Sequence, residues 1–402
     1  MLINSNSFRV ELMGVYFVCL LFLVRLSLLL SPALRPMLIW GGALIIVTMI
    51  LIPRINQLGK LPAEYWLYGS LILFSFIGIF QVTDFKGYFR YLQVLVSNLI
   101  LMITIYLVIR DLRDWEKLLR YFWLSVTLLV ILGYLFYAGD ANSEHYRFAG
   151  LLDNSNGTAT YSRAGILAAL VLFHLSRSIF YKAIYAVSIV FLSFVIILTA
   201  SRGNLLNLGF ILFSVFYIRY FSGWKSLILI LLMFVSFSYV SNMIISYLDD
   251  FYVFERLSRN EDLASALQNE GRIQLYLSTF HVFLEHPIFG VGLNQFRQYS
   301  GGKISHTDFL DILSQLGLIA GALYATIYFK LLKRLRKLLK QGLDNYLVKL
   351  LIIVLLSELI FGLTNPNWFL QLDMIILSLL ITFSSKSIAF SKQKSVQNHI
   401  EI

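Results

Sequence analysis

Long apolar runs separated by short polar stretches dominate this chain from its first residues almost to its last. A helix needs about 20 mostly apolar residues to cross a bilayer, and only helices or closed barrels satisfy the backbone there. The pattern predicts about 12 spanning helices, at residues 12–30, 37–53, 65–82, 91–109, 118–138, 163–177, 183–200, 205–220, 226–245, 307–330, 347–364 and 369–385. The predicted fold class is therefore an all-α membrane protein.

Two stretches between the predicted spans are long, at residues 139–162 and 246–306. The second contains a helix-like pattern over residues 271–285 and then a glycine-rich turn, His286-Pro-Ile-Phe-Gly-Val-Gly292. Long structured loops in compact proteins are usually functional. The chain thus divides into spans 1–9 with the first loop (residues 1–245), the large loop (246–306), spans 10–12 (307–388) and a polar tail (389–402) that we expect to be disordered.

Positive charge gives the expected orientation. The densest basic stretch is residues 330–340, between the tenth and eleventh predicted spans. Lys and Arg concentrate in cytoplasmic loops, so this stretch is predicted to be cytoplasmic. Alternation from there places both termini inside and both long loops outside. The first run is long for a signal-peptide core and lacks a clear cleavage site, so we expect it to be retained as a span.

Composition excludes several classes of protein. The chain is 58% hydrophobic and 14% charged, which is too apolar for a soluble domain of 402 residues. Its net charge of +11 falls in short clusters between spans, so it does not indicate nucleic-acid binding. The single cysteine, Cys19, forms no zinc motif, and no acidic cluster suggests a divalent metal. Nucleotide-binding and hydrolase motifs are absent, so we predict neither metal nor cofactor.

Three arginines lie on the predicted outer side, where topology disfavours basic residues: Arg147, Arg202 and Arg272. An arginine held at a membrane edge needs an anionic partner or water, and its planar fork matches a phosphate bidentately. A pyrophosphate headgroup in the outer leaflet meets that need. The alternative for each arginine is a loop carboxylate or a lipid headgroup.

His306 stands just before the tenth predicted span. A neutral imidazole can accept a proton from a sugar hydroxyl near neutral pH. We expect Ser305 to cap the following helix with Asp308 in its first turn, which would orient the imidazole. The alternative is a solvated histidine at a helix start.

Three ionisable residues fall within predicted spans: Arg25, Glu358 and Asp373. Charges in a membrane must find partners. We therefore predict that Arg25 pairs with one of the two acids, in a structural role.

Four short motifs occur in a characteristic order. They are Ser201-Arg-Gly203 after a span, Gly271-Arg272 at the start of the loop helix, the His-Pro-x-x-Gly-x-Gly turn, and His306 before a span that carries Gln315-x-Gly317-x-x-x-Gly321. An upstream Arg147-Phe-Ala-Gly … Asn154-Ser-Asn156 segment matches an Arg-x-x-Gly … Asn-Pro-Asn pattern except for Ser155. Over residues 145–330 the chain resembles the O-antigen ligase and O-antigen polymerase superfamily of bacterial envelope enzymes.

The resemblance implies a fold similar to the metal-independent GT-C glycosyltransferases, in the bacterial inner membrane. It implies an undecaprenyl-pyrophosphate-linked glycan as donor and a sugar hydroxyl as acceptor, on another repeat unit or on lipid A-core. A chain-length regulator is a further possible partner. By the same resemblance, Arg202, Arg272 and His306 are the expected catalytic residues. The residues expected to bind substrate are Arg147, Asn154, Asn156, Arg163 and Asp308.

Two departures from the family pattern favour a repeat-unit polymerase over a ligase. The family histidine is often followed by asparagine, whereas this chain has Thr307, and ligases tend to carry Gly, Thr or Tyr where it has Ala320. A ligase that transfers glycan to lipid A-core is the alternative. A flippase for the same lipid-linked sugars is the alternative of another class, but it would place its charges in a central cavity and use short loops.

Overall fold

The computed structural model describes residues 5–23, 42–136, 148–152, 154–220, 271–366 and 368–400. All regular structure in these residues is helical. The chain forms two compact units: unit 1 comprises Met1–Val126 and Glu270–Ile402, and unit 2 comprises Thr127–Asn269.

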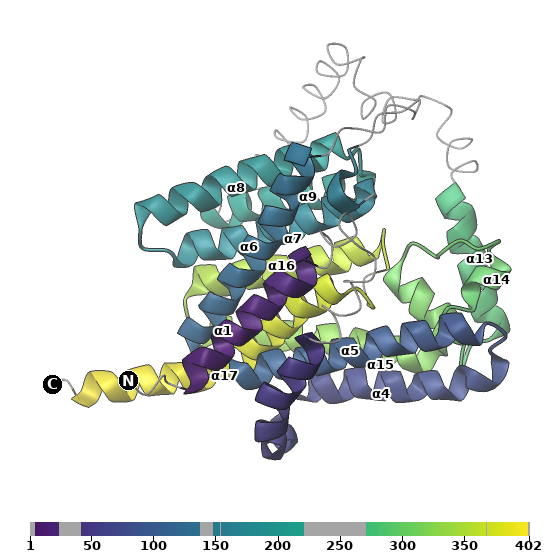
Figure 1. Ribbon diagram of the computed structural model, residues 1–402, viewed down its shortest axis with the longest axis horizontal. Helices are drawn as coiled ribbons and strands as arrows, with labels where there is room; N and C mark the ends of the chain where they lie inside the picture. The colour runs from purple at the N-terminus through teal and green to yellow at the C-terminus, as the bar shows by residue number, and fades with distance from the viewer. Residues whose placement is uncertain are drawn as a thin grey trace, which may run out of the picture. The chain divides into compact units, whose positions relative to one another are not determined.

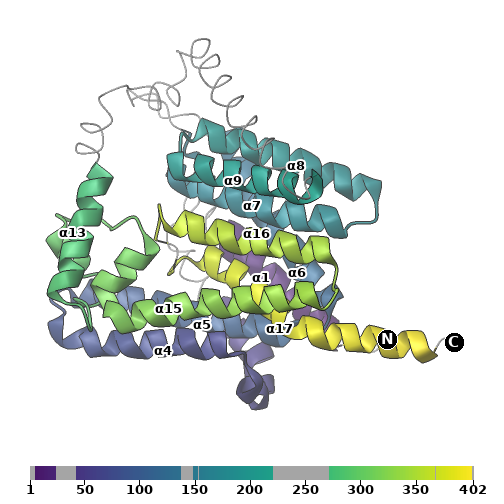
Figure 2. The same ribbon diagram turned by 180° about the vertical axis from the view of Figure 1, so that it is seen from behind.

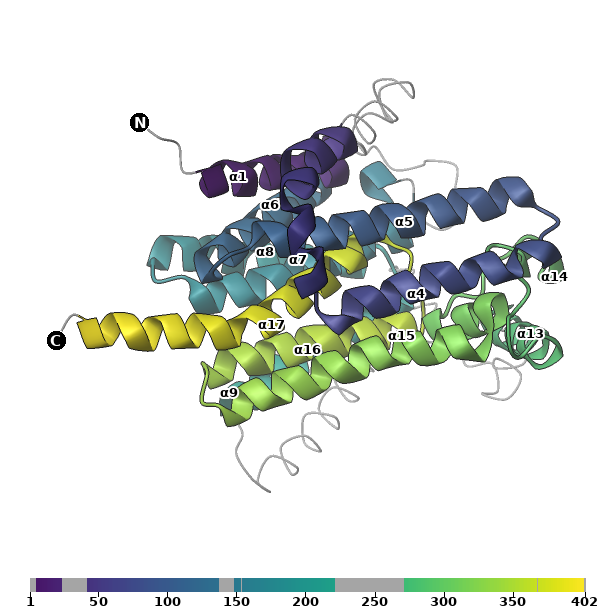
Figure 3. The ribbon, with the colours of Figure 1, turned by 90° about the horizontal axis from the view of Figure 1, so that it is seen from below.

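Unit 1 contains most of the long helices. Its elements are α1 (Ser5–Phe17), η1 (Val18–Leu23), η2 (Val47–Leu51), η3 (Ile52–Lys60), α4 (Ala63–Ile77), η4 (Gly78–Gln81), α5 (Phe85–Val108), α13 (Gly271–Glu285), α14 (Phe296–Tyr299), α15 (Asp308–Lys340), α16 (Asn345–Gly362) and α17 (Gln371–Ile400). Helix α15 packs on α4, α13, α16 and α17, and α5 packs on α4 and α17. Figures 1 and 3 show α4, α5 and α15 running alongside one another.

Unit 2 is a smaller bundle. It holds η5 (Gly150–Leu152), α7 (Ser155–Leu175), α8 (Ile179–Leu198) and α9 (Arg202–Tyr220), while α6 (Leu112–Phe136) runs from unit 1 into it. Helix α7 packs extensively on α8, and both contact α9, as Figure 2 shows.

Eight of the described helical segments are long and apolar enough to cross a membrane. They are Gly42–Lys60, Ala63–Gln81, Phe85–Val108, Leu112–Phe136, Ser155–Leu175, Ile179–Leu198, Asp308–Lys340 and Asn345–Gly362. The predicted span at 226–245 lies outside the described residues, as do parts of the first two. The count of about 12 spans therefore stays a prediction.

Unit 1 has two distinct ends. At its basic end, Arg334 of α15 pairs with the fully buried Glu64 of α4 at 2.8 Å, and Lys386 of α17 donates to the carbonyl oxygen of Tyr106 near the end of α5 at 2.6 Å. Its loop end is formed by residues 82–84, 286–307, 363–366 and 368–370. The basic stretch 330–340 and His306 therefore lie at opposite ends of α15, the arrangement that the predicted topology requires.

Helix α7 begins well before the predicted boundary at residue 163, so the loop predicted at 139–162 is shorter than expected. Asn154 caps the helix by accepting from the backbone N–H of Asn156 at 2.9 Å. Hydroxyls in the first turns bond back to the helix itself, such as Thr160 Oγ1 to the Asn156 carbonyl at 2.8 Å. The hydropathy boundary was wrong because these polar residues are satisfied within the helix.

Two other boundaries also differ from the prediction. Helix α15 continues to Lys340 rather than ending at residue 330, because Leu331, Leu335 and Leu338 form one buried stripe through the basic stretch. Helix α17 continues to Ile400, whereas we expected disorder after residue 388. The expectation was based on the polar composition of the tail, but polar residues such as Lys and Gln are good helix formers.

Candidate active site

The glycine-rich turn docks into a break in α15. The helix is interrupted at Gly317, where φ is +80°, so the carbonyls of the preceding turn lose their helical partners. The turn supplies them: the N–H of Val291 donates to the Ser314 carbonyl at 2.9 Å, and the N–H of Gly292 donates to the Gln315 carbonyl at 2.8 Å. The two glycine motifs are therefore two halves of one backbone contact.

Both halves of this contact need glycine. A Cβ on Gly317 would collide with the carbonyl oxygen of Ile288, and a Cβ on Gly290 would collide with the backbone of Gln315. Both glycines also have positive φ, which other residues rarely adopt. The motifs thus fix where the large loop meets the membrane helices.

Glutamines tie this turn to the loop end of unit 1. Gln315 Oε1 accepts from the N–H of Asn294 at 2.5 Å. Gln295 Oε1 accepts from the N–H groups of Thr83 and Asp84, each at 3.1 Å. Because Asp84 itself caps α5 through the Gly87 N–H at 2.9 Å, the loop is fastened to the start of α5.

Buried carboxylates hold the first turn of α15. Asp308 accepts from the Trp368 N–H and from Tyr324 Oη, each at 3.0 Å. Asp311 accepts from Trp368 Nε1 at 2.8 Å and from Ser305 Oγ at 2.7 Å. The α16–α17 connection is thereby locked onto α15.

The predicted capping arrangement is wrong. The N-cap of α15 is Thr307, which makes no side-chain capping bond. Ser305 instead bonds Asp311, because its hydroxyl reaches across the first turn to a buried carboxylate. Asp308 stands in the first turn as expected, but it holds Trp368 and Tyr324.

His306 is half-buried, between the buried Ser305 and Thr307. Its φ of +58° lies in the left-handed region. Among the described residues other than glycine, only Ala200 and Asn294 share a positive φ. Strained backbone of this kind gathers at functional sites. Here the three residues are His306, Ala200, which is two residues before Arg202, and Asn294, which is two residues after the glycine-rich turn.

Unit 2 carries Arg202 at the first position of α9. The preceding turn is buried at Thr199 and Ser201, and Asn204 Nδ2 donates to Ser201 Oγ at 3.0 Å. The N–H of Phe148 donates to the Leu198 carbonyl at 3.3 Å, which brings the segment before α7 to the same end of unit 2.

The predicted site residues divide between the two units. Asn154, Asn156 and Arg202 lie at one end of unit 2, while Arg163 is fully buried within α7. His306 and Asp308 lie together at the loop end of unit 1. Arg272 belongs to the first turn of α13, where only the backbone is described. Arg147 lies outside the described residues.

The predicted Arg25 pairing also falls outside the described residues, because Arg25 is not among them. Both acids proposed as its partner, Glu358 and Asp373, are buried. Within the described part of the chain, no three His, Cys, Asp or Glu side chains gather to hold a metal ion.

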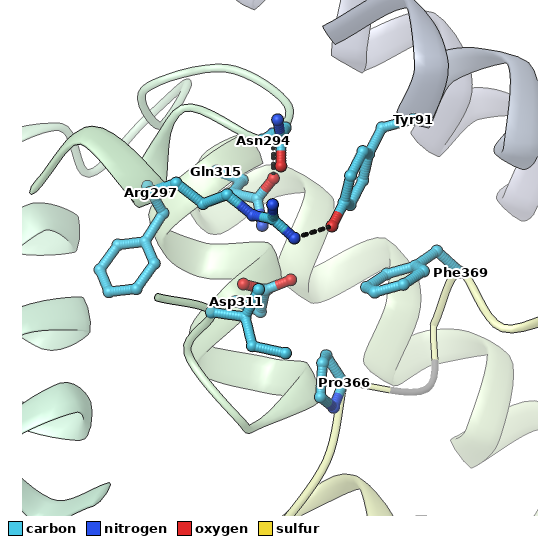
Figure 4. A pocket seen from close by; sticks show the side chains of 9 residues that line it. Tyr91, Asn294, Arg297, Asp311, Gln315, Pro366 and Phe369 are labelled. Atoms are coloured by element: carbon cyan, nitrogen blue, oxygen red, sulfur yellow. Dashed lines mark hydrogen bonds between the residues drawn. The ribbon is translucent and has the colours of Figure 1, made fainter. Parts of the chain in front are cut away.

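A small pocket opens at the loop end of unit 1, beside the first turn of α15. Its empty space is about 230 Å³, including the part open to solvent. It is lined by Tyr91, Asn294, Phe296, Arg297, Ile304, Asp311, Gln315, Pro366 and Phe369. Figure 4 shows the Arg297 side chain reaching over the Asp311 carboxylate to the Tyr91 hydroxyl, with Phe369 on the facing wall. Apart from Gln315, which belongs to the glycine motif of α15, sequence reasoning missed these residues because they come from four separate segments.

The stretch from the middle of α8 to the middle of α15 is similar to a known family. Residues 187–325 match the O-antigen ligase family. The match contains Arg202, Arg272 and His306, and it confirms the resemblance to the O-antigen ligase and polymerase superfamily. No curated protein matches the chain.

The match to the O-antigen ligase family fits the apolar helices. Together, the match and the eight long apolar helices among the described residues indicate a multi-pass membrane protein related to O-antigen biosynthesis. The family implies, in general terms, a lipid-linked glycan and an acceptor as substrates.

Proposed function

We propose that this protein transfers an undecaprenyl-pyrophosphate-linked oligosaccharide to a sugar hydroxyl at the periplasmic face, as a repeat-unit polymerase. The observation that carries the proposal is the O-antigen ligase match, which spans Arg202, Arg272 and His306 in one segment. The chemistry of these side chains suits the reaction, as argued above from phosphate recognition and proton transfer.

The proposed reaction exchanges one glycosidic bond for another. The acceptor hydroxyl oxygen bonds to the anomeric carbon of the donor sugar, while the bond from that carbon to the pyrophosphate oxygen breaks. His306 accepts the hydroxyl proton, and undecaprenyl pyrophosphate leaves with the bonding electrons. No metal takes part in this proposal.

Arg202 and Arg272 stabilise the leaving pyrophosphate. Negative charge grows on its oxygens as the bond breaks, and a fixed guanidinium there lowers the barrier by roughly 3–4 kcal/mol, by analogy with single oxyanion-hole donors. Arg147, Asn154, Asn156 and Arg163 are proposed to bind substrate. Asp308 would contribute by placing the first turn of α15, since its oxygens hold Trp368 and Tyr324.

The polymerase assignment rests on Thr307 and Ala320, where the superfamily's ligases tend to differ. A deletion strain tests it through its surface glycan. Loss of a polymerase leaves lipid A-core carrying one repeat unit. Bare core with polymer retained on the lipid carrier would instead make the protein a ligase, and repeat units trapped on the cytoplasmic leaflet would make it a flippase.

The catalytic roles are tested by complementing that strain. Arg202→Ala, Arg272→Ala and His306→Ala should each lower long-chain glycan by roughly 100-fold or more, because each removes about 3 kcal/mol or more of transition-state stabilisation. Arg202→Lys should also lose most activity, since an ammonium cannot make the two-pronged phosphate contact.

Arg219→Ala is the matched control for Arg202. Arg219 lies in the last turn of the same helix, with its guanidinium 5.7 Å from the Tyr220 ring centre. This variant should retain normal glycan at equal membrane abundance. Normal glycan in all three catalytic-site variants would overturn the assignment of roles.

A further inference from the structure

The pocket beside α15 has a wall of mixed chemistry. Tyr91 and Phe369 form an aromatic pair with ring centres 5.1 Å apart. Asn294, Gln315 and Asp311 present amide and carboxylate groups, and Arg297 presents a guanidinium. Ile304 also lines the pocket, two residues before His306, so the pocket is next to the candidate proton acceptor along the chain.

One polar group in this wall has no internal partner. Asn294 is 8% exposed, and its Oδ1 atom makes no hydrogen bond to any described residue. Its Nδ2 atom points to Asp84 Oδ2 at 3.4 Å. A buried amide oxygen without a partner is unfavourable, because it has lost its hydrogen bonds to water. The backbone at this residue has a φ of +63°, which asparagine adopts more readily than most residues, so the cost lies in the amide oxygen alone.

The charges in the pocket distinguish between ligands. Arg297 is exposed and Asp311 is buried, so the wall carries one group of each sign. A phosphate would have to approach the Asp311 carboxylate, which repels it. A sugar hydroxyl can donate to that carboxylate and to the Asn294 amide oxygen, and can accept from Arg297. Aromatic rings offer surfaces for the C–H face of a sugar ring.

Arg297 closes the pocket loosely. Its Nη2 atom donates to Tyr91 Oη at 3.4 Å, at the long limit of a hydrogen bond. With Arg297 in this position the pocket has room for little more than a water molecule, so a sugar ring can enter only once the exposed Arg297 side chain moves aside.

We propose that this pocket binds one uncharged sugar ring of the acceptor glycan and so selects the acceptor. The inference rests on the proposed glycosyl transfer, and it adds a second set of residues to that reaction. Asn294, Arg297, Asp311 and Phe369 act on acceptor recognition. Arg202 and Arg272 act on the donor pyrophosphate.

The test is a binding measurement on the full-length protein purified in detergent. The probe is the repeat-unit oligosaccharide, released from its lipid carrier by mild acid so that it carries no pyrophosphate, and binding is followed by saturation-transfer NMR. Arg297→Ala and Phe369→Leu should each weaken binding about 10-fold to 100-fold, the equivalent of losing one charged hydrogen bond or one packed ring. Both side chains are at least partly exposed, so the fold should survive their replacement.

Lys303→Ala is the matched control, because Lys303 is an exposed cation on the same loop and does not line the pocket. It should bind as the wild type does. Arg202→Ala should bind the free oligosaccharide normally although it transfers no glycan, which separates acceptor binding from donor chemistry.

Three results would overturn the inference. The first is a wild type that does not bind the oligosaccharide, and the second is unchanged binding by the two pocket variants. The third is Arg297-dependent competition for the pocket by inorganic pyrophosphate. A different outcome separates this inference from the proposed function. If the oligosaccharide binds at the pocket but the deletion strain has normal surface glycan, the proposed function is rejected and the sugar-binding site stands.

Discussion

Single glycines decide how the large loop meets the membrane helices. Gly317 breaks α15 so that its carbonyls can receive the N–H groups of the turn at 286–292. Gly290 allows the two backbones to touch. The glycine motifs that first indicated the family therefore have a mechanical explanation that is separate from catalysis.

Alanine substitutions at three glycines should separate strain from collision. Gly209→Ala, in a helix with free space around it, should be neutral or stabilising by about 0.5–1 kcal/mol. Gly301→Ala has free space but a φ of +64°, and should cost about 1–2 kcal/mol. Gly317→Ala adds a collision with the Ile288 carbonyl to a φ of +80°, and should cost the most.

The measurement is the temperature at which half of each detergent-purified variant is lost from the monodisperse peak. The expected order is Gly209→Ala, Gly301→Ala, Gly317→Ala from most to least stable. A Gly317→Ala protein as stable as the Gly301→Ala protein would contradict the docked break in α15.

At the scale of elements, hydrogen bonds to the connection between α16 and α17 hold the helices of unit 1 together. Tyr68 of α4 donates to the Trp368 carbonyl at 3.3 Å, and Asn98 of α5 donates to the Phe369 carbonyl at 2.9 Å. With Asp308 and Asp311 on α15, this short connection joins five helices beside the pocket. The first turn of α15 is held from several sides, which fixes the backbone next to His306.

Trp368→Phe should weaken the attachment of this connection to α15. The substitution removes the Nε1 donor and leaves a buried oxygen of Asp311 short of a hydrogen bond, at a cost of about 1–3 kcal/mol. The backbone bond from residue 368 to Asp308 is kept, so the protein should still fold with a lower melting temperature. Trp66→Phe is the control, because Trp66 lies 58% exposed on α4 and its loss should change little. Equal melting temperatures for the two variants would argue against a stabilising role for the hydrogen bond from Trp368 to Asp311.

At the scale of the whole molecule, the sequence predicts the course of the chain better than it predicts contacts. Periodic apolar runs correctly placed most long helices and the loop helix at 271–285, because a membrane helix needs only local polarity to be recognised. The predicted start of α7 and the predicted capping role of Ser305 were wrong, because hydropathy does not indicate which hydrogen-bond partner a hydroxyl group finds. Trp368 and Arg297 went unnoticed because their partners are distant in the sequence.

The orientation of unit 1 in the membrane yields the last prediction. The basic stretch at 330–340 should face the cytoplasm, so the loop end with His306 should face the periplasm. In a background with Cys19→Ser, which leaves no other thiol, Lys303→Cys should react with a membrane-impermeant maleimide on intact spheroplasts. Gln341→Cys should react only after the membrane is permeabilised. Both positions are exposed, so accessibility depends only on which side of the membrane they occupy. The opposite labelling would place His306 in the cytoplasm, on the wrong side for a donor presented in the outer leaflet, and glycan transfer by this residue would then be untenable.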